Sequence, residues 1–305
     1  MNLFRKICLV VTVLLSILLS FLFIAGCGGS AAPAAVTTPS PAASPLAGKT
    51  ITAFVGSASK PPMDEAAKVF ESQTGVKVYL TYGGSGTVLS QMELSKTGDL
   101  YIPGSPDYMV KSDAKNITDP ATAKIVAYLI PAICVQHGNP KNIHSLADLA
   151  RPGITVGIGN PATVCVGLYA VEILDYNHLL PEVYKNVITQ AASCENTASL
   201  ISLKSVDAVM GWSVFHYWNP ENIDAVYLKP EQLPRLAYIP AAISTFSREK
   251  EAAAAFIDFL TSKAGQGIFQ KWGYDVTEAE ARKYTPGAKI GGEYQLPDSY
   301  KALIK

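Results

Sequence analysis

The chain contains 305 residues, and its 25 lysine and arginine residues balance 25 aspartate and glutamate residues, for a formal net charge of zero. The absence of a basic excess argues against nucleic acid as a partner. Cysteine is sparse, at five residues, and a structural disulfide is expected only if the protein is exported.

The N-terminal segment predicts an exported lipoprotein. A basic start precedes an apolar run that ends in the sequence IAGCGGS. A basic region, an apolar region and small residues together are typical of a secretory signal, and IAGC resembles a bacterial lipobox. We therefore expect a signal peptide over 1–26 and a lipid anchor at Cys27, with an uncleaved membrane span as the alternative. Residues 27–48 contain small residues, proline and hydroxyl residues, which predict a flexible linker.

Strand-like and helix-like patterns alternate along the rest of the chain. In the first series, strands are expected at 49–59, 76–84 and 99–105, and helices at 61–75, 87–98, 106–115 and 120–129. In the second series, strands are expected at 130–138, 154–161, 187–192, 207–213, 225–230 and 236–244, and helices at 145–153, 166–179, 196–206 and, as a pair, over 248–274. The pattern is weak over 275–305, which predicts an extension on the surface.

This alternation predicts an α/β protein with two lobes, each a mostly parallel sheet flanked by helices. We assign 131–240 to lobe II. The first lobe, lobe I, takes the residues on either side of that segment, 49–130 and 241–305, and includes the extension at 275–305.

Four junctions between strands and helices are rich in glycine and hydroxyl residues: GSAS at 56–59, GGSGT at 83–87, NPATVCVG at 160–167 and SCENTAS at 193–199. Ligands of such sheets bind beyond the carboxyl ends of the strands. Helix N-termini there offer free N–H groups and a partial positive charge, which bind a small anion without arginine or lysine. The alternative is that each junction is only a helix cap.

The order of these segments resembles the periplasmic molybdate-binding proteins, the solute-binding components of oxyanion ABC importers. The resemblance runs from ITAFVGSASKPPMDEAAKVF and VYLTYGGSGTVLSQ through GNPATVCVGLYAVEIL and ENTASLISLKSVDAVMGW to AAAAFIDFLTSKAGQGIFQKWGY, and covers about 49–274. It implies a type II periplasmic-binding fold, with the ligand cleft between the two lobes.

The resemblance also implies which residues contact the ligand. The first serine of the family falls near Ser57, with Ala58 or Ser59 as alternatives, and the second falls at Ser85 beside Gly86. Backbone donors are expected near Val166 and Thr197. The family's tyrosine falls at about Gly211 and is missing there, so that Trp212, Ser213 or Tyr217 is the expected substitute, and we place Ser213 in the site.

Cys165 and Cys194 lie in two of the junctions and leave three interpretations open. They form a disulfide, they are free thiols that face the ligand or bind a soft metal, or they are buried without a role. No CxxC or HxxxH spacing indicates zinc, and the sequence predicts no metal site and no cofactor. Because GxSxG, HExxH and Walker motifs are absent from the sequence, we do not expect an enzyme.

We therefore expect a monomeric, lipid-anchored solute-binding protein that captures molybdate or tungstate and delivers it to an ABC permease. The lobes would close about hinges near Tyr128–Ala132 and Tyr238–Ala242. One alternative is transport of a different anion or small polar solute. The other is a redox or metal-handling extracytoplasmic protein that uses Cys165 and Cys194.

Overall fold

The structure is a computed structural model that describes residues 45–304. These residues belong to one compact unit, Ala43–Lys305. The expected signal peptide, the lipid anchor at Cys27 and most of the linker lie outside the described residues. Within 45–304, no helix is both long and apolar enough to cross a membrane.

Lobe I is built on a sheet in the order β11-β10-β3-β1-β2, with β4 also paired to β10. Strand β1 pairs in parallel with β2 and β3, whereas β10 runs antiparallel to β3 and β4. The strands are β1 Thr50–Gly56, β2 Lys77–Gly83, β3 Leu100–Ile102, β4 Lys124–Leu129, β10 Arg235–Ile243 and β11 Lys289–Ile290.

Lobe II is built on a second sheet in the order β7-β6-β8-β5-β9. Strand β6 pairs in parallel with β7 and β8, and β5 runs antiparallel to β8 and β9. The strands are β5 Pro131–Gln136, β6 Val156–Gly159, β7 Val187–Ala191, β8 Ala208–Trp212 and β9 Ile223–Tyr227. Both sheets are mixed. In the described part of the chain, three of the five pairings in lobe I are parallel and two antiparallel, and lobe II has two of each.

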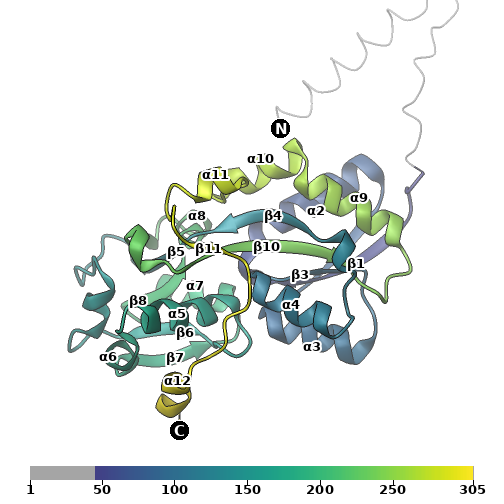
Figure 1. Ribbon diagram of the computed structural model, residues 1–305. Coiled ribbons are helices and arrows are strands. Elements are labelled where there is room, and N and C mark those ends of the chain that lie inside the picture. Colours follow the sequence, from purple (N-terminus) through teal and green to yellow (C-terminus); the bar gives the residue numbers. More distant parts are fainter. Residues whose placement is uncertain (1–44, 305) are drawn as a thin grey trace, which may run out of the picture. The chain divides into compact units, whose positions relative to one another are not determined.

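Helices cover both faces of each sheet, as Figure 1 shows for lobe I, with α2, α9 and α10 on one side and α3 and α4 on the other. The rings of Phe70 on α2 and Phe256 on α9 are 5.1 Å apart, which fixes the first of these layers. The helices are α2 Lys60–Thr74, α3 Ser85–Ser95, α4 Pro106–Ala114, α5 Cys165–Tyr176, α6 Leu180–Tyr184, α7 Cys194–Ser202, α8 Val214–Trp218, α9 Lys250–Thr261, α10 Lys263–Lys271, α11 Glu278–Ala281 and α12 Asp298–Leu303. Short 3-10 turns are η1 Ser57–Ser59, η2 Pro120–Thr122, η3 Leu146–Ala150 and η4 Pro230–Gln232.

The expected two-lobed α/β fold is confirmed, but one expected helix is a strand. The segment 120–129 forms η2 and then β4, which pairs along β10 from Leu129–Ala237 to Lys124–Ala241. Its alanines favour a helix in isolation, but the apolar residues at 126–129 are buried between neighbours in the sheet. Tertiary pairing has outweighed local propensity here.

The C-terminal extension contacts both lobes, which corrects its assignment to lobe I alone. Strand β11 pairs with the start of β10, but Tyr300 is buried in the lobe II core, where its ring lies 5.7 Å from that of Tyr184. The lobe boundary expected at 240 also moves, because β10 begins at Arg235 and belongs to the lobe I sheet.

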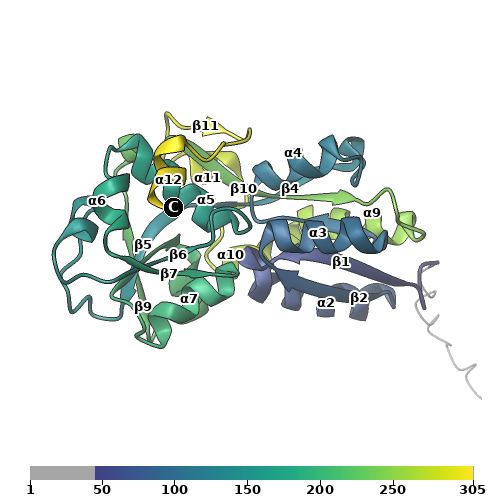
Figure 2. The ribbon, with the colours of Figure 1, turned by 90° about the horizontal axis from the view of Figure 1, so that it is seen from below.

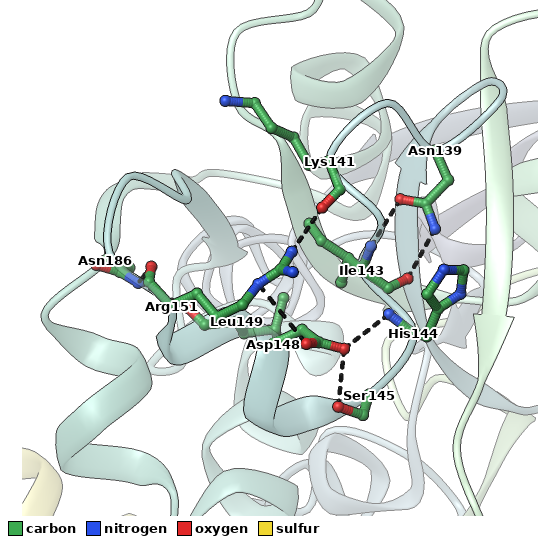
Figure 3. A network of polar contacts seen from close by, with 9 residues as sticks. All are labelled: Asn139, Lys141, Ile143, His144, Ser145, Asp148, Leu149, Arg151 and Asn186. Carbon is green, nitrogen blue, oxygen red and sulfur yellow. Dashed lines mark hydrogen bonds and ion pairs between the residues drawn. The ribbon is translucent and has the colours of Figure 1, made fainter.

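A polar network fixes the outer loop of lobe II between β5 and β6 (Figure 3). Asp148 accepts hydrogen bonds from the backbone N–H of His144 and the hydroxyl of Ser145, both at 2.9 Å. Asn139 bonds both the N–H and the carbonyl of Ile143. These bonds pair polar groups of the loop with one another, and Asn186 adds hydrogen bonds to the carbonyls of Leu149 and Arg151, so the network is structural.

Candidate functional site

The four glycine-rich and hydroxyl-rich junctions meet at the boundary between the two lobes, which lie side by side in Figure 2. The backbone N–H of Gly86 donates to the carbonyl of Thr163 at 2.8 Å, which joins 83–87 to 160–167. The N–H of Glu195 donates to the hydroxyl of Ser57 at 3.3 Å, which joins 193–199 to 56–59. Each junction of lobe I is thus hydrogen-bonded to a junction of lobe II.

Gly84 allows three of these junctions to approach one another. A Cβ atom at this position would lie 2.8 Å from the carbonyl oxygen of Thr163 and 2.9 Å from that of Ala192. Real Cβ atoms do not tolerate such contacts with backbone. A residue other than glycine would therefore push the lobes apart at the start of α3.

Ser85 is the most connected of the expected ligand residues. Its side chain is buried, and its hydroxyl accepts a hydrogen bond from the N–H of Gly104 at 3.0 Å. Its carbonyl accepts from the hydroxyl of Tyr101 at 2.9 Å. As the first residue of α3, it stands where helix N–H groups have no intrahelical partner. These two hydrogen bonds hold Ser85 in place at the start of α3.

Three candidates from the first junction form η1 and are all buried. The hydroxyl of Ser57 points to lobe II, where it accepts from Glu195. Ser59 instead donates back to the carbonyl of Gly56 at 3.5 Å, and the carbonyl of Ala58 accepts from the Tyr274 hydroxyl. Of the three, Ser57 is the one whose side chain reaches across the lobe boundary.

Val166 and Thr197 lie in the first turns of α5 and α7, as expected. The N–H and the hydroxyl of Thr197 both donate to the carbonyl of Ser193, at 2.9 and 2.8 Å. Thr197 therefore has no free donor in this arrangement. The N–H of Glu195 in the same turn does reach lobe I, and sequence reasoning did not single it out.

Cys165 and Cys194 begin α5 and α7, and their sulfur atoms are 3.4 Å apart. Both cysteines are free and buried, so the structure shows a thiol pair and no disulfide. Burial raises the pKa of Cys165 well above its ordinary value, Cys194 adds to the rise, and a hydrogen bond with Ser85 opposes it. The Cys165 thiol is therefore protonated at neutral pH. Within 45–304, no three His, Cys, Asp or Glu side chains gather as a metal site.

Ser213 lies at the crossing between the lobes. Its N–H donates to the carbonyl of Ile130 at 2.8 Å, next to the start of β5. Burial raises the pKa of Tyr227 to about 12, and a hydrogen bond with Ser213 opposes this rise. The other substitutes differ in exposure, since Trp212 is fully buried and Tyr217 is 46% exposed. No hydrogen bond found among the described residues joins Ser213 to the four junctions.

A fifth junction, Pro103–Gly104–Ser105 between β3 and α4, belongs to the same place and was missed. A Cβ atom on Gly104 would lie 2.6 Å from the sulfur of Cys165 and 2.7 Å from the Cβ of Ala58. Its sequence carries the same signal as the other four, a glycine and a hydroxyl residue between a strand and a helix. We expected a strand as far as residue 105, which hid that signal.

The nearest full positive charges are already paired within the protein. Lys60, at the edge of the first junction, bonds Asp64 at 3.0 Å and lies 4.4 Å from the ring centre of Tyr82. Arg235 is buried between Asp107 and Glu172. The candidate site therefore offers hydroxyls, thiols and helix N-termini, and these are neutral groups.

Comparisons with known proteins identify relatives of this chain. The family model described as bacterial extracellular solute-binding protein matches residues 51–275. A Haemophilus influenzae protein named only as a binding protein is 25% identical over 222 residues, which cover 72% of this chain and 89% of that protein. The molybdate-binding protein ModA of Escherichia coli is 24% identical over 242 residues, which cover 74% of this chain and 89% of that protein.

A solved structure shows the same fold. The sulfate-binding protein SubI from Mycobacterium tuberculosis aligns with a TM-score of 0.68 at 20% identity, over 80% of this chain and 94% of that chain. The family match contains all four junctions and confirms the resemblance to the periplasmic molybdate-binding proteins. The proteins of this family bind solutes rather than catalyse reactions, and they act outside the cytoplasm with a membrane permease. This chain belongs to the family of bacterial extracellular solute-binding proteins.

Proposed function

We propose that this solute-binding protein captures a tetrahedral oxyanion, molybdate or tungstate, and delivers it to the permease of an ABC importer. The observation that carries the proposal is the convergence of four hydroxyl-rich and glycine-rich junctions at the lobe boundary. Two hydrogen bonds, Gly86 to Thr163 and Glu195 to Ser57, join them across that boundary.

The chemistry of the junctions suits a small anion. The starts of α3, α5 and α7 bring the positive end of the helix dipole to the boundary. At α7 the N–H groups of Glu195 and Thr197 already bond Ser57 and Ser193 in this arrangement. Ser57 and Ser85 add hydroxyl groups, and Gly84 and Gly86 allow the backbone to approach. Neutral donors that enclose a dianion each donate a hydrogen bond to a charged group, and each such bond contributes about 1.5–3 kcal/mol.

Binding would couple to movement of the lobes about the strands that connect them. The chain crosses from β4 to β5 at Ile130 and returns before β10 at Arg235. A ligand bonded to both lobes favours their closed arrangement, which is the form that a permease would recognise. Anchoring through a lipid on Cys27 would keep the protein near that permease.

Molybdate is the first candidate because the Escherichia coli relative is named for it. The SubI structure, which is named for sulfate, shares only the fold. Molybdate, tungstate and sulfate share charge and shape, so a competition measurement is needed. Native mass spectrometry and calorimetry with molybdate, tungstate, sulfate and phosphate should show one bound molybdate or tungstate per protein. Binding of none of these anions would refute the proposal.

The thiol pair favours a second candidate, the handling of a soft metal or metalloid. Its supporting observation is the 3.4 Å separation of the Cys165 and Cys194 sulfurs at the same boundary. Replacing both cysteines by serine distinguishes the two functions. Oxyanion transport predicts that molybdate binding persists in the double variant, whereas thiol chemistry predicts that uptake of a soft metal ion is lost.

A further inference from the structure

Three unpartnered polar atoms lie in one short segment beside the candidate site. Among the described residues, the buried side-chain atoms without a hydrogen-bond partner include Ser105 Oγ, Asp107 Oδ2 and the Tyr108 hydroxyl. All three residues are at most 1% exposed. Buried polar groups normally have partners. Asp107 Oδ2 is an acceptor on the carboxylate that pairs with Arg235, whereas the Ser105 and Tyr108 hydroxyls are donors that another group can bond.

Ser105 and Tyr108 belong to the fifth junction and to the first turn of α4. Ser105 is the N-cap residue of this nine-residue helix, but its side chain makes no cap hydrogen bond. The preceding residue, Gly104, donates its N–H to the hydroxyl of Ser85. The start of α4 is therefore bonded directly to a residue of the candidate site.

The ring of Tyr108 lies where the two lobes touch. A Cβ atom on Gly86 would be 2.9 Å from the Cε1 atom of Tyr108 and 3.1 Å from the Cα atom of Thr163. Burial raises the pKa of Tyr108, and Cys165, Asp107 and Cys194 raise it further. The hydroxyl is thus within electrostatic reach of both thiols and stays a protonated donor.

The neighbouring Tyr101 differs from Tyr108 because its buried hydroxyl has a hydrogen-bond partner in the protein. Tyr101 is also fully buried, and its hydroxyl donates to the carbonyl of Ser85 at 2.9 Å. Tyr108 has no such bond, although its side chain is 1% exposed and the ammonium group of Lys111 lies 4.8 Å from its ring centre. The protein holds the Tyr108 ring in place and leaves its hydroxyl unused.

We propose that the Tyr108 hydroxyl donates a hydrogen bond to the bound oxyanion, with Ser105 as a second donor, so that the β3–α4 junction forms a fifth wall of the site. The inference rests on the proposed function and names further ligand residues for it. Both donors are neutral, as are those of the other four junctions. They come from lobe I and add to Ser57 and Ser85.

The test compares Tyr108→Phe with Tyr101→Phe and Tyr169→Phe by calorimetry with molybdate and tungstate and by thermal unfolding without ligand. We expect Tyr108→Phe to weaken binding at least tenfold, about 1.4 kcal/mol, without lowering the ligand-free unfolding temperature. Tyr101→Phe should lower that temperature, because its hydroxyl has a partner in the protein. Tyr169→Phe is the matched control, since its hydroxyl is also buried and unpartnered, and its affinity should stay within twofold of wild type.

Two results overturn the inference in different ways. If wild type binds molybdate or tungstate and Tyr108→Phe binds equally well, the fifth wall is refuted and the proposed function stands. If only Tyr169→Phe weakens oxyanion binding, the fifth wall is also refuted, and the donor belongs to lobe II. If wild type binds neither anion, the proposed function fails and the inference fails with it.

Discussion

Two polar clusters are buried between lobe I and lobe II, and one is charged whereas the other is neutral. The charged cluster is centred on Arg235, with Asp107 from α4 and Glu172 from α5. The neutral cluster is the candidate site, with Ser57, Ser85 and the thiol pair. Both join the same two lobes, so their difference in chemistry reflects different roles.

The charged cluster is satisfied almost entirely by the protein itself. Arg235 donates from Nε and Nη2 to the carboxylate of Glu172, from Nη1 to the carbonyl of Gly292 at 3.0 Å, and pairs with Asp107 at 2.9 Å. The guanidinium also lies 4.5 Å from the ring centre of Tyr169. The N–H of Tyr294 completes the cluster by donating to Asp107 at 2.8 Å. It therefore ties α4, α5, β10 and the C-terminal extension together.

The neutral cluster differs because two hydroxyl donors beside it, those of Ser105 and Tyr108, have no partner among the described residues. The buried charges of the Arg235 cluster are paired within the fold, whereas we propose that hydroxyls and helix N-termini bind the ligand. A site without a fixed positive charge does not retain an anion by charge attraction alone. It depends on enclosure by both lobes, which links affinity to closure.

The largest expected effect comes from removing the charge at the centre of the first cluster. We expect Arg235→Ala to lower the free energy of unfolding by about 3–5 kcal/mol, because two buried carboxylates lose their partner. Burial already raises the pKa of Glu172, and Arg235 opposes this rise. Without Arg235 the folded-state pKa rises further, so the deficit in stability should grow as pH increases.

The matched control for this prediction is Lys185→Ala. Lys185 pairs with Glu182 at 2.6 Å on the surface, where such pairs contribute about 0–1 kcal/mol. Urea unfolding at several pH values measures both variants. If both variants lose the same free energy of unfolding, the Arg235 cluster stabilises the fold no more than a surface ion pair does.

The next largest effect is expected on oxyanion affinity at the neutral cluster. We expect Ser85→Ala to weaken oxyanion binding at least tenfold, because a hydrogen bond to a charged group contributes about 1.5–3 kcal/mol. The variant also loses the acceptor for Gly104, so the unfolding temperature must be measured beside the dissociation constant. Ser72→Ala, on an exposed turn of α2, is the control. An unchanged dissociation constant would remove Ser85 from the site.

The neutral cluster was largely predictable from the sequence because its signal is local. Glycine and hydroxyl residues between a strand and a helix mark a junction, and the parallel strands of one sheet bring such junctions to one edge. Tyr108 was missed for a related reason. It lies inside a helix with ordinary spacing, and only the packing of its ring against Gly86 reveals its position.

The charged cluster was not predictable, although Arg235 stands out as a charge in an apolar strand. Its partners are 128 and 63 residues away in the chain, in different lobes. No local pattern selects Asp107 or Glu172 among the many acidic residues. The path of the extension was hidden likewise, because Tyr294 and Tyr300 pack against lobe II as isolated aromatic residues rather than as part of a repeating pattern.

A smaller effect is expected at the thiol pair. Both sulfurs are free and buried, so reduction should leave affinity unchanged, whereas alkylation should weaken it severalfold through bulk. Because Cys134 is also free, the measurement is best made in a Cys134→Ser background. Bound molybdate should slow alkylation if the thiols face the ligand. Equal affinity before and after complete alkylation would separate both cysteines from the site.

The smallest effect concerns Asp275, where the extension begins. Its backbone N–H and carbonyl flank β4, and the carbonyl accepts from the N–H of Tyr128 at 2.7 Å. Burial raises the pKa of its carboxyl from the ordinary 3.8 to about 6, and Glu280 adds to the rise. The folded state therefore holds this proton more tightly than the unfolded chain does, and stability is lost as pH rises from about 3.8 to about 6.

Asp275→Asn removes this loss. Urea unfolding at neutral pH and at pH 4 measures the difference in free energy of unfolding between Asp275→Asn and wild type. We expect this difference to favour the variant more at neutral pH than at pH 4. Because solvent screens the half-buried group, the increase should be less than about 1 kcal/mol. If the variant differs from wild type by the same free energy of unfolding at both pH values, the carboxyl has the same pKa in the folded and the unfolded chain.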